Sequence, residues 1–488
     1  MATAARGQRI LSLRFPLAGV QRRFGYRDSA DWKPPFPSPW AVNIRPEDPL
    51  ARRLRGGSRP GLTEYSGTYA GSTIGAMLSV QVSSESGADT KLVVLADAVG
   101  FLVAGQQYAY AIAAGGITKI DPKTGGTEAL TAVHGTLPTG NTFGAIYRDR
   151  LFLAGADNAI WPSAVGDYTD WDTSLDASKT TRALPPFQLS GAANVGALPT
   201  ALVPFRDRGL LAVTAGSLWA IRGDPGTADG LSEVSSHVGI LAPRAWCQLD
   251  EGPVAFLATD GVYQVGPDGG TLTNLSGQRL PVELRDIDTA TTTVLLGYDR
   301  GWQGVHIYLT TAAGGDTHWF FHLETQTFWP MRLQDDHSPT AVCEHEGQLL
   351  LAGTDGYIRS VGGADDDGQE IESHVLLGPI ALGGEPKFGQ IVNLHGLLGD
   401  GSGTVYWRIV TGDTPEDAAA RGKAAIEAYQ DGGDYAMYVA AEGTWSEGRS
   451  RIAYPRVRGV WAVLWLSSVA QWAYEQAVMQ TAPSARWR

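Results

Sequence analysis

The chain has 488 residues, with 38 Lys and Arg against 51 Asp and Glu, which gives a net charge of −13. This length is enough to bury a large core and is typical of two to four domains. The sequence lacks a run of about 18 apolar residues and an N-terminal apolar core, so we expect neither a membrane span nor a secretory signal. The 61 glycines and 15 tryptophans favour an all-β protein with many tight turns.

The charge is distributed unevenly along the chain. Residues 1–61 hold twelve Lys and Arg against four Asp and Glu, which is +8, and the remainder is −21. The acidic remainder is expected to repel a phosphate backbone, because non-specific nucleic-acid binding needs clustered cations. The basic segment could contact nucleic acid or an acidic protein neighbour.

Residues 1–61 are predicted to form a basic extended arm. The stretch 10–15 alternates like a short strand, and four prolines within 32–39 favour a polyproline-like path. Residues 40–46 read as one strand that ends at Pro46. The arginine- and glycine-rich stretch 52–62 lacks the Gly-Lys-Ser/Thr of a phosphate loop, so we interpret it as a turn and a subunit contact. The residues predicted to contact neighbouring subunits are Arg52, Arg53, Arg55, Arg59, Trp40 and Trp487.

A repeated hairpin predicts a β-propeller over residues 62–378. Its clearest copy is 147–155, where a charged turn leads into a short apolar strand, and it returns as 205–213; looser copies are 250–258 and 345–353. Each copy is followed by a second turn and another strand, and in two copies this turn is Asp-Gly. Asp-Gly between apolar runs is a strong hairpin signal. Repetition at blade-length spacing predicts about six blades, with five or seven as alternatives. Residues 91–96 and 108–112 would form a first unit, and 305–329 the unit before the last copy.

Residues 379–488 are predicted to form a small β-sandwich-like domain that carries one helix. The stretch 405–410 alternates cleanly between polar and apolar residues. Thr414 can cap a helix that runs to about Tyr429, since Pro415 suits its first position and Glu416 and Asp417 complement its dipole.

The search for reactive residues predicts no catalytic, cofactor or metal site, and no enzyme. Nine scattered histidines are interpreted as structural; His318 and His322 would lie roughly 13 Å apart on one strand. The acidic stretch 365–367 lacks calcium-loop spacing, so we expect a solvated acidic loop. Cys247 and Cys343 show no metal spacing and are expected to be buried thiols.

Several segments resemble a group of bacteriophage structural proteins. They are residues 15–20, the aromatic and proline-rich stretch 32–40, Asn43 to Pro46, Arg55 to Leu62, and 161–171 with its Gly-Asp and Trp. These segments are similar to the tail nozzle or hub proteins of short-tailed phages, also called packaged-DNA stabilisation or tail tubular proteins. The resemblance implies a virion structural protein of the phage tail, assembled in the host cytoplasm.

The same resemblance implies the partners of the chain. They are further copies of itself in a ring of six, an adaptor or head-to-tail connector ring, and tail fibre or tail needle proteins. The ring would surround the channel through which DNA leaves, with transient, non-specific DNA contact.

Two alternatives remain open at this stage. The first is a glycan-binding or host-recognition propeller, a lectin or an enzyme, that would use Trp161, Trp171 and Trp219. The second is another virion component, such as a tail-ring or capsid-decorating protein.

Overall fold

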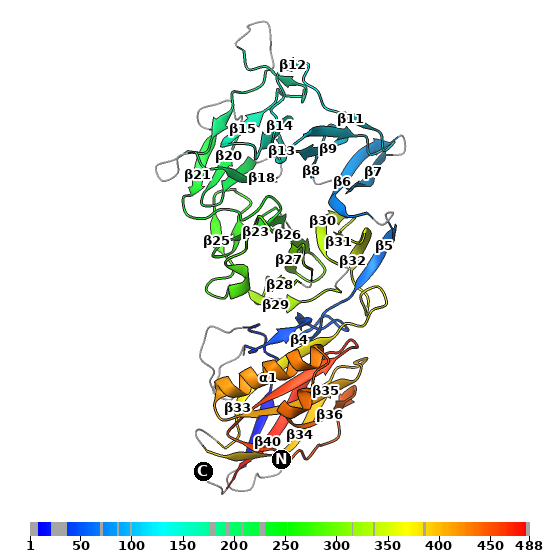
Figure 1. The fold of residues 1–488 in the computed structure, drawn as a ribbon, viewed down its shortest axis with the longest axis vertical. Helices are drawn as coiled ribbons and strands as arrows, with labels where there is room; N and C mark the ends of the chain where they lie inside the picture. Colours follow the sequence, from blue (N-terminus) through cyan, green and yellow to red (C-terminus); the bar gives the residue numbers. More distant parts are fainter. Residues whose placement is uncertain are drawn as a thin grey trace. The chain divides into compact units, whose positions relative to one another are not determined.

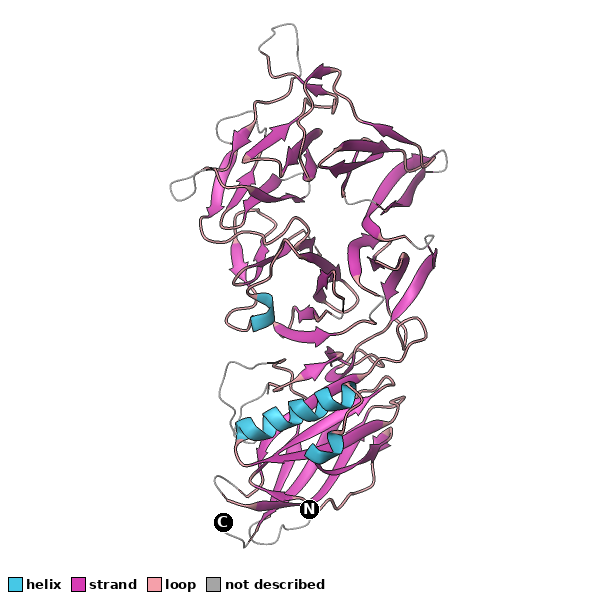
Figure 2. Ribbon diagram, viewed as in Figure 1, coloured by secondary structure: helices cyan, strands magenta, loops and turns pink. Residues whose placement is uncertain are grey.

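The computed structural model describes residues 8–20, 37–68, 72–84, 87–97, 100–174, 182–190, 196–205, 209–223, 230–250, 252–314, 316–334, 337–383 and 387–484. The chain divides into two compact units. Unit 1 comprises residues 1–63, 317–332 and 362–488, and unit 2 comprises 64–316 and 333–361. Strands dominate both units (Figure 2). None of the described helices has the length and apolarity that a membrane crossing needs.

Unit 2 is a β-propeller built from consecutive antiparallel sheets (Figure 1). Its four-stranded sheets are β8–β11, β13–β14–β15–β17, β18–β21, β22–β25 and β30–β31–β32–β5, and the pairs β6–β7 and β26–β27 belong to the same series. The strands of the first half are β5 (Leu62–Thr68), β6 (Ile74–Ser84), β7 (Gly87–Ala96), β8 (Phe101–Gly105), β9 (Tyr108–Ala113), β10 (Gly116–Ile120), β11 (Thr127–Ala129), β13 (Phe143–Tyr147), β14 (Arg150–Ala154), β15 (Ala159–Pro162), β17 (Phe187–Gln188), β18 (Pro199–Phe205), β19 (Gly209–Thr214), β20 (Leu218–Ile221) and β21 (Leu231–Ser235). Those of the second half are β22 (Trp246–Gln248), β23 (Val254–Ala258), β24 (Gly261–Val265), β25 (Leu272–Asn274), β26 (Thr292–Asp299), β27 (Gly304–Thr311), β30 (Pro339–His345), β31 (Gln348–Gly353) and β32 (Tyr357–Val361). A small parallel pair, β12 (His134–Gly135) with β16 (Asp170–Trp171), and the 3-10 helix η2 (Val282–Leu284) complete the unit.

The sheets follow one another around a ring. The first strands pack in the order β30, β6, β8, β13 and β18, and β26 packs against both β22 and β30. The hydroxyl of Thr200 in β18 donates to the carbonyl of Ile240, just before β22, at 2.8 Å. Because β5 comes from near the start of the chain and joins β32, the last sheet contains both ends of the propeller sequence.

The repeated hairpin predicted a β-propeller correctly, but the described residues form seven sheets around the ring, which is the higher alternative and not the expected six. Its four copies correspond to the β13–β14, β18–β19, β22–β23 and β30–β31 turns, each followed by a third strand. Strands β14, β19 and β23 are buried along their whole length, because a neighbouring sheet covers each of their faces. This explains their continuous apolar runs. Residues 91–96 and 108–112, predicted as one unit, lie instead in two successive sheets, β6–β7 and β8–β11.

Unit 1 contains two five-stranded sheets. The first is β1–β40–β34–β37 with β38 beside β34, and the second is β2–β33–β39–β35–β36. Gly396 of β34 lies directly against the Trp445 ring of β36, so the two sheets form a sandwich as predicted. The strands of unit 1 are β1 (Arg9–Leu13), β2 (Ala41–Val42), β3 (Ile44–Glu47), β4 (Leu54–Ser58), β28 (His318–His322), β29 (Thr327–Met331), β33 (Ser373–Ala381), β34 (Gly389–Leu398), β35 (Val405–Gly412), β36 (Val439–Trp445), β37 (Gly448–Arg449), β38 (Arg458–Gly459), β39 (Trp461–Ser468) and β40 (Tyr474–Pro483).

The predicted helix is present in unit 1. Helix α1 (Pro415–Gln430) begins after Thr414, whose hydroxyl accepts a hydrogen bond from the amide of Asp417 at 3.0 Å. Its buried face, including Ala418 and Ile426, packs against β33, β35 and β39. A 3-10 helix, η3 (Tyr435–Tyr438), follows it and leads into β36.

The described part of the basic arm is integrated into unit 1. Strand β1 pairs with β40 near the other end of the chain, β2 pairs with β33, and β3 pairs with β4. The domain boundaries expected at residues 61 and 378 therefore differ from those of the two units. The single strand expected over 40–46 is instead two, because Asn43 adopts a left-handed conformation (φ 56°) and β3 continues through Pro46.

The two units also differ in charge. Unit 2 holds 15 Lys and Arg against 30 Asp and Glu, which is −15, whereas unit 1 holds 23 against 21, which is +2. The propeller therefore carries the net negative charge of the protein.

Candidate functional site: the centre of the propeller

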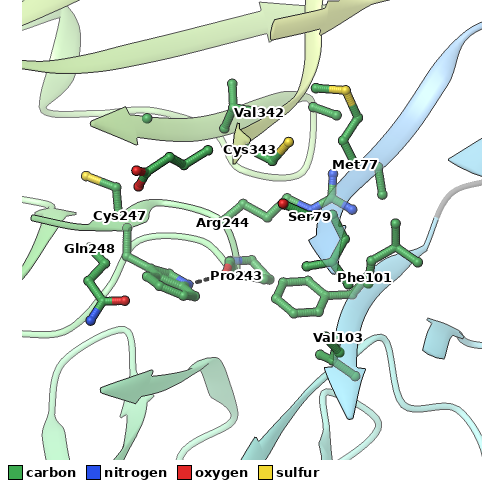
Figure 3. A pocket seen from close by; sticks show the side chains of 18 of the residues that line it. Met77, Ser79, Phe101, Val103, Pro243, Arg244, Cys247, Gln248, Val342 and Cys343 are labelled. Atoms are coloured by element: carbon green, nitrogen blue, oxygen red, sulfur yellow. Dashed lines mark hydrogen bonds between the residues drawn. The ribbon is translucent and has the colours of Figure 1, made fainter. Parts of the chain in front are cut away.

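The first strands of the sheets enclose a cavity of about 490 Å³ at the centre of unit 2. Every sheet in the ring contributes to its wall, which is mainly apolar. Figure 3 shows side chains from β6, β8, β22 and β30 converging on this space. The residues used below are Phe101, Arg244, Cys247 and Cys343.

Arg244 is the cation of this wall, and it links several sheets. Its Nη1 donates to the carbonyls of Gly75 in β6, at 2.7 Å, and Thr340 in β30, at 3.3 Å. Its Nη2 donates to the carbonyl of Gly100, directly before β8. The guanidinium carbon lies 5.7 Å from the centre of the Phe101 ring. The Arg244 side chain therefore connects the segment before β22 to three other sheets of the ring.

The main-chain carbonyl of Arg244 adds a further connection, since it accepts from the amide of Leu296 in β26 at 3.0 Å. Burial lowers the pKa of Arg244 to about 10, so the guanidinium is charged at neutral pH. Hydrogen bonds to a charged group are each worth roughly 1.5–3 kcal/mol. We interpret Arg244 as a residue that stiffens the ring.

Both cysteines of the chain line this cavity, Cys247 on β22 and Cys343 on β30. Burial raises the pKa of both thiols, that of Cys343 to about 12. They are therefore protonated at neutral pH, which is the form that neither attacks an electrophile nor binds a metal well. The expectation of buried thiols is confirmed for Cys247, while Cys343 is partly exposed. The cavity offers an apolar space with one fixed positive charge.

The predicted subunit-contact residues lie in different environments. Trp40 is buried in the core beneath α1, and Arg59 is buried against the carboxylate of Asp366. Arg55 pairs with Asp48, at 2.8 Å, and with Glu475. Arg52 and Arg53 are exposed, and Trp487 lies outside the described residues. Contact with another subunit stays a prediction, and Arg52 and Arg53 are the described members best exposed for it.

The acidic stretch 365–367 was predicted as a solvated loop, and this is wrong for Asp366. Its side chain is buried and accepts two hydrogen bonds from Arg59, one of them from Nη1 at 2.8 Å. Its neighbours Asp365 and Asp367 are exposed as expected. The sequence alone does not distinguish the three aspartates. Asp366 differs from its neighbours because Arg59, 307 residues away in the sequence, packs against it in the fold.

The aromatic residues of the glycan-binding alternative are mostly inside the protein. Trp171 and Trp219 are each about 6% exposed, and the indole of Trp219 donates to the hydroxyl of Ser217. Neither ring presents a face on which a sugar could stack. Trp161 is half-buried.

One group of side chains with metal-ligand chemistry occurs among the described residues. It comprises Glu47, His322 and Glu324 of unit 1, whose ligand atoms all lie within 4.8 Å of one another. The sequence did not reveal it, because Glu47 precedes the other two by some 275 residues.

Comparison with known proteins finds no matching family model and no matching curated protein. Solved structures with similar folds include virginiamycin B lyase from Staphylococcus aureus, which is 13% identical and covers 61% of this chain and 98% of its own, with a TM-score of 0.39. BamB from Moraxella catarrhalis is 11% identical over 61% of this chain and 97% of its own, with a TM-score of 0.34. The WD40 β-propeller domain of Doa1 is 11% identical over 62% of this chain and 96% of its own, also with a TM-score of 0.34. At these scores the similarities add nothing to the strand order and packing described above.

Proposed function

We propose that this chain is a virion structural protein, a subunit of the ring-shaped tail nozzle or hub of a short-tailed phage. The ring, of about six copies, would attach below the portal and adaptor and surround the DNA exit channel. The observation that supports the proposal is the position of three phage-like segments, which begin at Phe15, Asn43 and Arg55 and contribute to the interior of unit 1.

Phe15 opens the first of these segments and lies in the core of unit 1. Its ring stacks on Trp329 at 5.8 Å and lies 5.8 Å from the ring of Tyr474. Gly56 of a later segment passes so close that a β-carbon there would lie 2.2 Å from the Phe15 ring. Residues from two separate phage-like segments thus pack in direct contact. This contact supports a shared architecture rather than a chance match of short motifs.

Asn43 and Arg59 connect two further segments of the resemblance. The side-chain amide of Asn43 donates to the carbonyl of Glu372 at 2.8 Å, and its oxygen accepts from Arg59 at 3.0 Å and from the amide of Arg332 at 2.9 Å. Gly61 in the same region leaves no room for a β-carbon, which would lie 1.8 Å from the carbonyl oxygen of Asp365. These residues have structural reasons to occur together.

Charge suggests how such a ring would work. A propeller with a net charge of −15 repels a phosphate backbone, so DNA would slide past it without binding. A gate made of loops or of a partner protein would hold the packaged genome. The exposed cations Arg52 and Arg53 would contact an acidic neighbour and help to set the geometry of the ring.

Electron microscopy and mass photometry of the purified full chain test this proposal. We expect closed rings of about six copies, and mass spectrometry of phage particles should detect the chain at a similar copy number. A chain that is monomeric at high concentration and absent from particles would refute it. A glycan array provides a separate check, and strong, specific binding there would favour the host-recognition alternative.

A further inference from the structure

The Glu47–His322–Glu324 group lies where two separate segments of unit 1 meet. Glu47 ends β3, whereas His322 and Glu324 belong to the end of β28 and the turn into β29. His322 Nε2 lies 3.4 Å from Glu47 Oε1. Two ligands of one tetrahedral zinc ion, each about 2.0–2.1 Å from the metal, are separated by about 3.3 Å. The spacing of this pair therefore already suits a shared ion.

The imidazole of His322 is held in the orientation that a metal ligand needs. Its Nδ1 lies 2.9 Å from the hydroxyl of Thr325, which in turn lies 2.6 Å from the hydroxyl of Thr327. The backbone amide of Thr325 donates to the same Nδ1 at 3.3 Å, so Nδ1 accepts here and the proton of the neutral ring lies on Nε2, facing Glu47. An ion bound between His322 and Glu47 would take the place of this Nε2 proton. The Thr325 hydroxyl could then accept a proton from Nδ1, as a second group usually does beside a metal-bound histidine.

The accessibility of the group permits an ion to enter. His322 is buried, Glu47 is half-buried and Glu324 is exposed. The exposed Glu324 side chain can rotate toward the other two, and water can complete the coordination.

We propose that Glu47, His322 and Glu324 bind a divalent transition-metal ion of the zinc type. One imidazole and two carboxylates match the preferences of such ions, whereas calcium prefers six or more oxygen ligands. A bound ion would join the end of β3 to the β28–β29 turn and so fix the N-terminal segment within unit 1. This inference does not depend on the proposed nozzle function.

Isothermal titration of the EDTA-treated, dialysed full chain with Zn²⁺ tests the proposal. We expect one ion per chain, bound more tightly than Ca²⁺, and a rise in the melting temperature of the protein. His322→Gln should weaken binding by about 100-fold and Thr325→Val by about 10-fold, since even partners outside the ligand set commonly contribute 10–100-fold.

Glu324→Gln is the variant that keeps the test decisive, because this exposed side chain can change without disturbing the fold. We expect it to weaken Zn²⁺ binding by at least about 10-fold. His395→Gln, a change at a half-buried histidine of β34 in the same unit, is the control and should bind Zn²⁺ like the parent chain. No binding up to about 1 mM Zn²⁺, unchanged binding by Glu324→Gln, or tighter binding of Ca²⁺ would each overturn the proposal.

Discussion

In the propeller, the buried guanidinium of Arg244 donates to backbone carbonyls from three sheets, whereas in unit 1 that of Arg59 pairs with the carboxylate of Asp366. The first arrangement depends on backbone atoms that no side-chain substitution can remove. The second includes the side chain of Asp366, from a segment 307 residues away, beside the side-chain oxygen of Asn43 and the carbonyls of Pro60 and Arg332. Both arginines join segments that are distant in the sequence, but only Arg59 has a charged side chain as a partner.

This difference predicts that unit 1 is the more sensitive to loss of a single polar partner. Asp366→Ala leaves the Arg59 guanidinium buried without its carboxylate, and we expect the free energy of unfolding to fall by about 3–5 kcal/mol. Urea denaturation of the full chain, followed by tryptophan fluorescence, measures this change. Asp365→Ala, at the exposed neighbour, is the control, and we expect it to cost under about 1 kcal/mol. Equal effects of the two variants would contradict the central role of the Arg59–Asp366 pair.

Arg244→Met tests the corresponding residue of the propeller. It removes the charged donors from three carbonyls but keeps much of the side-chain volume, so we expect a loss of about 3 kcal/mol. Arg300→Met is the matched control, because Arg300 is exposed and pairs with Asp250 at the surface of the same unit. Its loss should stay below about 1 kcal/mol. If Arg244→Met left the free energy of unfolding unchanged, sheet packing alone would be sufficient to close the ring.

The pH dependence of stability offers a smaller effect, which is specific to unit 1. Burial lowers the pKa of His374 below its usual value of 6.5, against the opposing effect of Glu372, whose carboxylate lies 3.4 Å away. As the pH falls through 6.5, the unfolded chain therefore binds a proton that the native chain does not, and the native state loses stability. One such group contributes up to about 1.4 kcal/mol per pH unit.

Denaturation curves at pH 7.5, 6.5 and 5.5 measure this slope. His374→Gln should flatten it, since a glutamine can still accept the hydrogen bond from Trp465 but does not titrate. His237→Gln, at an exposed histidine of the propeller, should leave the slope as it is. An unchanged slope in the His374 variant would show that this residue does not carry the effect.

The exposed arginines of unit 1 should affect assembly and leave folding nearly unchanged. For the double variant Arg52→Glu with Arg53→Glu we expect a change in unfolding free energy below about 0.5 kcal/mol. Rings should nevertheless dissociate, as judged by mass photometry. Arg421→Glu, on the exposed side of α1, is the control and should keep the ring intact. Rings of normal stability in the double variant would remove these residues from the subunit interface.

The sequence predicted the propeller because its signal is local. A turn followed by an apolar strand recurs within each sheet, and strands such as β14 and β23 are buried on both faces, so their apolar runs stand out. Helix α1 was also predictable, because Thr414, Pro415 and Asp417 mark its first turn.

What the sequence could not show depends on segments that meet only after folding. Nothing in the stretch 1–61 indicates that β1 pairs with β40. The sequence around residue 366 likewise does not show that Asp366 pairs with Arg59 while its neighbours stay exposed. Arg244 lies in a short connection before β22 without any repeat signature, and its role follows from carbonyls on three other sheets. Glu47 and His322 similarly come together from distant positions.

The central claim is that this chain forms the wall of a ring-shaped phage tail assembly. Cryo-electron microscopy of the purified full-length protein, with mass photometry on the same sample, tests that claim most directly. The account predicts closed rings of about six subunits in which Arg52 and Arg53 lie at the contact between neighbours. A population that remains monomeric across the whole concentration range would contradict it.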